Sequence, residues 1–158
     1  MGVTVSQPVE RFPMIGTVES PALFCDGQRL LVCYEIAVVD GGGTATIEFR
    51  DIVSFSCLPL NIDGLHTHNT ELSYWDINEV SGDPRLASSS IRSRRLWVIS
   101  FNDVTLEILF GGMVGLVDVQ RISDSPEAAL RKLISGKRLT ERLFKPLGKS
   151  SKTYDKGS

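Results

Sequence analysis

The stretch that decides the fold is Arg95-Leu-Trp-Val-Ile-Ser-Phe101, followed by Asn102-Asp103 and Val104-Thr-Leu-Glu-Ile-Leu-Phe110. A two-residue turn at Asn102-Asp103 would pair large apolar residues of the two runs: Phe101 with Val104, Ile99 with Leu106, and Trp97 with Ile108. The opposite face would then collect Ser100, Thr105, Glu107 and Val98. Slipping the register by one residue would bury the polar side chains, so the pattern predicts one specific antiparallel hairpin.

A second hairpin is predicted upstream. Residues 29–39 alternate with a period of two, Asp40-Gly41-Gly42-Gly43 provides turn residues, and Thr44–Arg50 resumes the alternation. The first of these strands is apolar on both faces. After Asp51 the phase changes, which predicts a bulge or the start of a new strand that ends at Pro59.

The remaining β segments are less regular. Residues 14–18 could form a short strand, residues 61–69 and 81–90 are typical of loops, and residues 116–122 are the expected last strand. The segment Leu72–Val80 is compatible with a half-buried strand or with an irregular helical turn.

A helix is predicted after the last strand. Ser125 suits an N-cap, Pro126 the first helical position and Glu127 the positive end of the helix dipole. The apolar stripe consists of Ala129, Leu130, Leu133 and Ile134, and Gly136 is a suitable stop. A second helical stretch is expected around Leu139, Leu143 and Leu147.

These elements predict a mainly β fold, an antiparallel sandwich or partly closed barrel of about six or seven strands with a C-terminal α-helix. Residues 1–20 would be an N-terminal arm or edge segment. Residues 21–147 would form a single domain, with its helical segment at about 125–147, and residues 148–158 a disordered tail.

In the order of its elements the chain resembles a pleckstrin-homology-type module, in which a closing helix caps a small barrel. Lipid-binding members of that group carry basic residues around the first hairpin loop. Asp40-Gly41-Gly42-Gly43 contains none, so the resemblance implies an architecture and not a phosphoinositide site.

Composition excludes several classes of protein. The chain has 158 residues, 42% of them hydrophobic, and no apolar run is long enough for a transmembrane segment. The first residues lack the features of a secretory signal. Three cysteines, Cys25, Cys33 and Cys57, fit no zinc pair or disulfide framework, which favours reduced thiols and a cytoplasmic location. We also expect the protein to be of bacterial type.

The net charge of −2 hides an uneven distribution. From Arg121 onward there are ten basic residues against four acidic ones, and before it seven against fifteen. We expect the basic helical segment to pack on the acidic body, with binding to an anionic membrane surface as the alternative.

The sequence contains few candidate catalytic or metal-binding residues. His66 and His68 would project to the same side of an extended segment, near Asp63 and Glu71, and are weak candidates for a metal site. The chain has no Gly-x-Ser-x-Gly elbow and no Gly-Lys-Ser/Thr phosphate loop. We therefore expect no catalytic residue and no cofactor.

Two groups of residues are candidates for binding. Tyr74 and Trp75 form an aromatic pair of the kind that anchors interfaces. Arg94, Arg95 and Trp97 combine basic and aromatic groups, although the acidic body makes nucleic acid an improbable partner.

The first hypothesis is therefore a noncatalytic interaction domain that presents a sheet edge or an aromatic patch to a protein partner or to a second copy of itself. It rests partly on the strand at residues 29–39, whose two apolar faces suggest that one face seeks a partner. The second hypothesis is a small hydrolase or metal-dependent enzyme that uses His66 and His68. The third is a peripheral protein that binds anionic surfaces through its basic C-terminal helix.

Overall fold

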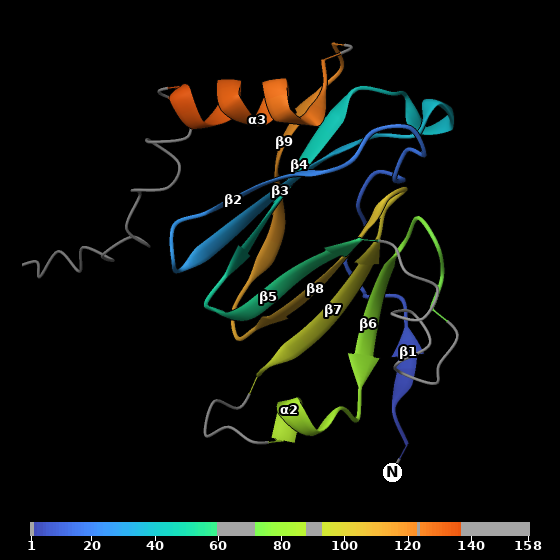
Figure 1. The fold of residues 1–158 in the computed structure, drawn as a ribbon, viewed down its shortest axis with the longest axis vertical. Helices are drawn as coiled ribbons and strands as arrows, with labels where there is room; N and C mark the ends of the chain where they lie inside the picture. Colours follow the sequence, from blue (N-terminus) through green and yellow to red (C-terminus); the bar gives the residue numbers. More distant parts are fainter. Residues whose placement is uncertain (1, 60–71, 88–92, 123, 137–158) are drawn as a thin grey trace, which may run out of the picture.

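The computed structural model describes residues 2–59, 72–87, 93–122 and 124–136. These residues form two antiparallel sheets packed face to face (Figure 1). The five-stranded sheet has the order β1 (Thr4–Ser6), β6 (Ile77–Ser81), β7 (Arg95–Ser100), β8 (Val104–Phe110) and β5 (Ile52–Pro59). The four-stranded sheet has the order β2 (Ala22–Cys25), β3 (Arg29–Glu35), β4 (Thr44–Arg50) and β9 (Val114–Gln120).

The predicted class is confirmed: the fold is a mainly β, antiparallel sandwich with a short C-terminal helix, α3 (Pro126–Ser135). The two sheets do not close into a barrel. The described residues contain nine strands, more than the six or seven predicted, because β1 and β2 were not identified as strands. Each has only three or four residues, too few for a clear alternation.

The hairpin of β7 and β8 has the predicted register. Trp97 lies opposite Ile108 and Ile99 opposite Leu106. The amide of Phe101 donates a hydrogen bond to the Val104 carbonyl at 2.9 Å, which closes the turn at Asn102-Asp103. Slippage of this hairpin would move its large apolar side chains out of the core.

The hairpin of β3 and β4 is also confirmed, with a longer turn than the four residues expected. Glu35 pairs with Thr44, and the chain between them includes a 3₁₀ turn, η1 (Val38–Asp40). Gly43 has a φ of +86°, and a Cβ atom there would lie 2.0 Å from the Gln120 carbonyl oxygen. Only glycine allows this close approach of the turn to the end of β9.

The phase change after Asp51 marks a corner where the chain passes from one sheet to the other. Asp51 has a φ of +54°, between β4 in the four-stranded sheet and β5 in the five-stranded sheet. Beside it Gly111-Gly112 carries the chain from β8 to β9. The Gly111 amide donates to the Asp51 carbonyl at 2.9 Å, and the Arg50 amide donates to the Met113 carbonyl at 3.0 Å. The two crossings therefore form one bent ribbon that joins the sheets at this end.

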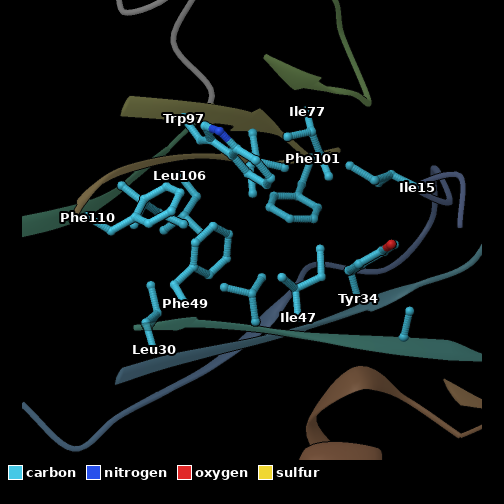
Figure 2. Close-up of a cluster of buried hydrophobic side chains, with 14 of the residues drawn as sticks. Ile15, Leu30, Tyr34, Ile47, Phe49, Ile77, Trp97, Phe101, Leu106 and Phe110 are labelled. Atoms are coloured by element: carbon cyan, nitrogen blue, oxygen red, sulfur yellow. The ribbon is translucent and has the colours of Figure 1, made fainter. Parts of the chain in front are cut away.

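The main core lies between the sheets (Figure 2). Its centre is a group of three aromatic rings, from β4, β7 and β8. The ring of Trp97 meets the rings of Phe49 and Phe110 edge to face at 5.5 and 5.6 Å, and Phe49 meets Phe110 at 5.1 Å. All three side chains have an exposed fraction of 0%. These edge-to-face contacts add to the large apolar area that the rings bury.

The outer face of the four-stranded sheet is covered by α3 (Figure 1). Leu31 and Cys33 of β3 pack against Ala129 and Leu130 of the helix. The second apolar face of β3 is thus covered by a helix of the same chain, and the inference that it binds an external partner is wrong. The helix also lies across a sheet, whereas a pleckstrin-homology-type helix caps a barrel end, so that expectation is wrong too.

The helix itself begins and ends as predicted. The Ser125 side chain accepts a hydrogen bond from the Ala128 amide at 3.2 Å, Pro126 occupies the first turn, and Gly136 follows the last helical residue. Ile134 is 36% exposed, so the buried stripe is narrower than predicted. The second helical stretch and the tail predicted beyond residue 136 lie outside the described residues.

The N-terminal arm connects the open sides of the two sheets. Its β1 pairs with β6 in the five-stranded sheet, and further along Ile15 forms a bridge with Ile36 at the end of β3. Between these points Phe12 packs against Trp97 at 6.0 Å. The arm therefore belongs to the folded sandwich, as an edge segment that spans both layers.

Other expectations are decided by local structure. Residues 14–18 form only the single bridge at Ile15. The segment Leu72–Val80, compatible in sequence with a strand or a helical turn, is a turn followed by β6. The connection after β6 contains a short helix, α2 (Pro84–Ala87). No helix among the described residues is long and apolar enough to cross a membrane.

Replacement of Trp97 by alanine should lower the free energy of unfolding by about 3–5 kcal/mol, because it leaves a large cavity between Phe49 and Phe110. Urea unfolding followed by circular dichroism measures this loss. Val38, which is 88% exposed, offers the control: Val38→Ala should change the unfolding free energy by less than about 0.5 kcal/mol. A similar, small effect of both variants would contradict the placement of Trp97.

Candidate functional site

The aromatic pair Tyr74 and Trp75 lies on the surface, in the turn before β6. Their side chains are 50% and 47% exposed, and their ring centroids are 6.2 Å apart. Two large aromatic rings side by side and half in water leave apolar area that a partner could cover. The structure thus places both predicted residues where they can contact another molecule.

The backbone at Trp75 is strained. Its φ is +50°, in the left-handed region that bulky residues rarely adopt. Most positive-φ positions of the described chain are glycines. A tryptophan at such a position costs stability, and strain of this kind is concentrated at functional sites.

The aromatic pair lines a cleft of about 520 Å³. One wall is the turn at residues 74–77, and the other wall is the N-terminal arm together with Ala37. The residues that line it are Gln7, Pro8, Glu10, Arg11, Phe12, Pro13, Met14, Ile15, Thr17, Ala37, Tyr74, Trp75, Asp76 and Ile77. We call this the aromatic cleft. It lies within the size range of roughly 300–1,000 Å³ typical of ligand pockets.

The turn that carries the aromatic pair is fixed by Asn78. This side chain is only 2% exposed. It accepts a hydrogen bond from the Ser73 amide at 2.9 Å and donates to the Ser73 carbonyl at 3.0 Å. It also donates to the Val98 carbonyl of β7 at 3.2 Å. Asn78 therefore anchors both ends of the turn to the five-stranded sheet.

The two walls are also joined to each other. Gln7 donates a hydrogen bond to Asp76 Oδ2 at 2.6 Å. On the arm side, Tyr34 donates to the Pro13 carbonyl at 2.7 Å, and the Met14 amide donates to Asp40 Oδ2 at 2.8 Å. The cleft is therefore preformed.

The surface around the cleft carries further exposed apolar side chains. Met14 is 59% exposed, and Val38 and Val39, in the turn that follows Ala37, are 88% and 85% exposed. Arg11 is the basic residue of the cleft. Among the described residues its guanidinium has a single partner, the Pro8 carbonyl at 3.0 Å.

Arg95 is committed to contacts inside the protein. Its guanidinium lies 5.0 Å from the Trp97 ring and 5.8 Å from the Phe110 ring. It donates to both carboxylate oxygens of Glu10 at 2.6 and 2.8 Å and to both of Glu79 at 2.6 and 2.9 Å. These partners raise the pKa of Arg95 above its usual value. A guanidinium held by two carboxylates has little capacity left for a phosphate.

The five predicted binding residues therefore do not form a single site. Tyr74 and Trp75 lie together at the cleft, whereas Trp97 is buried in the core and contacts Arg95 there. Arg94 precedes β7 and is half-buried, and among the described residues its buried Nε has no hydrogen-bond partner. The basic and aromatic combination is structural in this fold, and the aromatic pair is the candidate that remains on the surface.

Sequence reasoning missed the other wall of the cleft. Arg11, Met14 and Ala37 gave no motif, and no local pattern connects residues 7–17 with residues 74–77. The only signal was composition: Pro8 and Pro13 indicate an extended arm, which must pass over some other part of the molecule.

The enzymatic hypothesis concerns His66 and His68, which lie outside the described residues, so it stays a prediction. Within the described part of the chain, no group of three or more His, Cys, Asp or Glu residues could hold a metal ion. The three cysteines are free, and burial raises the pKa of the Cys33 thiol, which disfavours its nucleophilic thiolate form.

The described part of the basic C-terminal segment pairs its charges locally. Arg131 donates to Glu127 within α3 at 2.7 Å, and Lys132 pairs with Asp124 just before the helix. These two cations are exposed to solvent, while the apolar side of α3 packs on the four-stranded sheet, as expected for a basic helix that packs on the β body. The remaining basic residues, beyond residue 136, are outside the described residues, and binding to anionic surfaces stays a prediction.

Comparison with known proteins adds no assignment. No protein-family model, curated protein or solved structure matches the chain.

The contact between Glu10 and Arg95 should make the free energy of unfolding depend on pH. The hydrogen bond from Arg95 lowers the pKa of Glu10 below its ordinary value of 4.5. The contact therefore stabilises the fold fully above pH 4.5, and its contribution is lost as the pH falls through the lower, folded-state pKa. Glu10→Gln should lower the melting temperature at pH 7, with the difference from wild type narrowing below pH 4. Thermal unfolding at both pH values checks this, and a constant difference would contradict it.

Proposed function

We propose that this chain is a noncatalytic interaction domain that holds an extended segment of a partner protein in the aromatic cleft. The observation that carries the proposal is Trp75: a large ring, half exposed, kept at a strained φ of +50° on the rim of a preformed cleft. A strained and exposed tryptophan costs stability, and a binding role would explain why that cost is accepted.

The chemistry of the cleft favours a protein segment as the occupant. Tyr, Trp, Met and Arg are the residue types enriched where protein partners bind, and the cleft and its margin offer Tyr74, Trp75, Met14 and Arg11. The aromatic rings and Met14 would cover apolar side chains of the partner. Arg11, which among the described residues bonds only to a carbonyl, would pair with an acidic side chain.

The rigidity of the cleft supports tight binding of a short segment. Hydrogen bonds donated by the side chains of Gln7, Tyr34 and Asn78 hold the two walls in place. Little conformational freedom is then lost on the protein side when a partner binds.

We also infer a cytoplasmic location from the odd number of cysteines, an inference that their free state in the structure supports.

A random peptide library displayed on phage tests the proposal. Peptides selected on the wild-type domain should contain apolar residues near an acidic one, and should bind the Tyr74→Ala, Trp75→Ala double variant at least about tenfold more weakly, a loss of about 1.4 kcal/mol. Tryptophan fluorescence shows whether the peptide binds at the cleft, because Trp75 is 47% exposed and Trp97 is 0% exposed. A bound peptide should protect Trp75 from acrylamide quenching.

The matched control is Val18→Ala, an apolar truncation at a residue that is 72% exposed and does not line the cleft. It should leave peptide binding unchanged. Peptides that bind the double variant as well as the wild type, or selection that yields none, would contradict the proposal.

The Trp75→Gly variant separates binding from structural packing. Glycine adopts a positive φ without strain, which relieves about 1–2 kcal/mol, while the added freedom of the unfolded chain costs about 0.5–1 kcal/mol. The free energy of unfolding in urea should therefore stay constant or rise by up to about 1.5 kcal/mol, as peptide binding is lost. A decrease of more than about 1 kcal/mol would show that Trp75 is retained for packing instead.

A further inference from the structure

The longest strand of the fold, β5, has one unpaired side within the described residues. It pairs with β8 and ends the order of the five-stranded sheet, as Figure 1 shows. The Ile52 amide donates to the Gln28 carbonyl at 3.2 Å. Beyond Ile52, the backbone amide and carbonyl groups on this side of β5 have no partner strand among the described residues and can form hydrogen bonds with another strand.

Before Pro59, the sequence of β5 contains no residue type that blocks such pairing. Residues 52–59 read Ile-Val-Ser-Phe-Ser-Cys-Leu-Pro and contain no charged residue. Val53, Phe55 and Leu58 are 42%, 39% and 56% exposed. Phe55 lies opposite Ile108, a core residue, so the apolar inner face of the sheet extends into solvent at this edge.

The other edges of the described sheets are better protected. Strands β1 and β2 have three and four residues. Strand β9 contains the charged Asp118, and both β9 and β5 have a register shift in their pairing, so irregularity does not distinguish these two edges. Short length and charge are usual means by which proteins block pairing at an edge. Among the described edges, β5 is the one that combines length, neutrality and exposed apolar side chains.

We propose that β5 pairs antiparallel with β5 of a second copy of this chain, joining two five-stranded sheets into one continuous sheet. A neutral strand suits a second copy because it meets no like charge when it lies beside itself. A twofold axis normal to the sheet keeps corresponding faces together. Phe55 and Cys57 of both copies then lie on one face, and Ser54, Ser56 and Leu58 on the other.

The new ladder is limited to residues 53–58. The Ile52 amide already donates to the Gln28 carbonyl, and Pro59 has no amide hydrogen to donate. A strand pair of this length buries less surface than the roughly 1,200–2,000 Å² of standard stable interfaces. We therefore expect a dimer that dissociates on dilution. Because this edge is formed by β5 and the aromatic cleft by residues 7–17, 37 and 74–77, the dimer does not rest on the function proposed above.

Size-exclusion chromatography with light scattering over a wide concentration series tests the proposal on the full chain. The wild type should pass from monomer to dimer as its concentration rises. Phe55→Lys and Leu58→Lys should each weaken dimerisation by on the order of tenfold or more, because the twofold axis counts each added charge twice. Leu116→Lys, on the edge strand of the other sheet at 43% exposure, should dimerise like the wild type.

Hydrogen exchange of the wild type locates the interface without any substitution. Amides of β5 should exchange more slowly at concentrations where the dimer forms, while those of β2 should not change. The Tyr74→Ala, Trp75→Ala variant should still dimerise, which separates failure of this proposal from failure of the cleft. A wild type that stays monomeric at the highest concentration reached, or a dimer without added protection in β5, would overturn the proposal.

Discussion

The contact on which the rest of the structure depends is made by the guanidinium of Arg95. It stacks against Trp97 at the centre of the core and binds the carboxylates of Glu10 in the arm and Glu79 in β6. One side chain thus connects the interior, strand β6 and the segment that spans both sheets. The arm in turn forms one wall of the aromatic cleft, so the shape of the candidate site depends on a charge that is paired inside the protein.

The parts of the fold that could be predicted from sequence are those in which local pattern and packing agree. The hairpin of β7 and β8 was predicted to the register, because its alternation sorts polar from apolar residues on both sides of a tight turn. The cap and start of α3 were predicted because Ser125 and Pro126 act on the next few residues only. Neither prediction required information from distant parts of the chain.

The incorrect predictions concern residues whose partners lie far away in the sequence. Strand β3 is apolar on both faces, and sequence alone could not show that α3, nearly a hundred residues later, covers its second face. Arg95 resembled a free basic residue because one of its carboxylate partners, Glu10, lies 85 residues away. The aromatic pair was found because Tyr74 and Trp75 are adjacent, whereas the opposite wall of the cleft is brought to them only by the path of the arm.

The corner at Asp51 and Gly111-Gly112 has a consequence for motion. Strands β4 and β8 both run toward it, so Ala37 and Ile77 lie at the opposite end of the sandwich. Since the sheets are linked by continuous strands at the corner alone, small rotations of one layer against the other have their largest amplitude at that opposite end. The aromatic cleft lies there, and the arm is the element that resists its widening. A rotation of one layer against the other would change the width of the cleft, and the hydrogen bonds of the arm to Tyr34 and Asp76 oppose it.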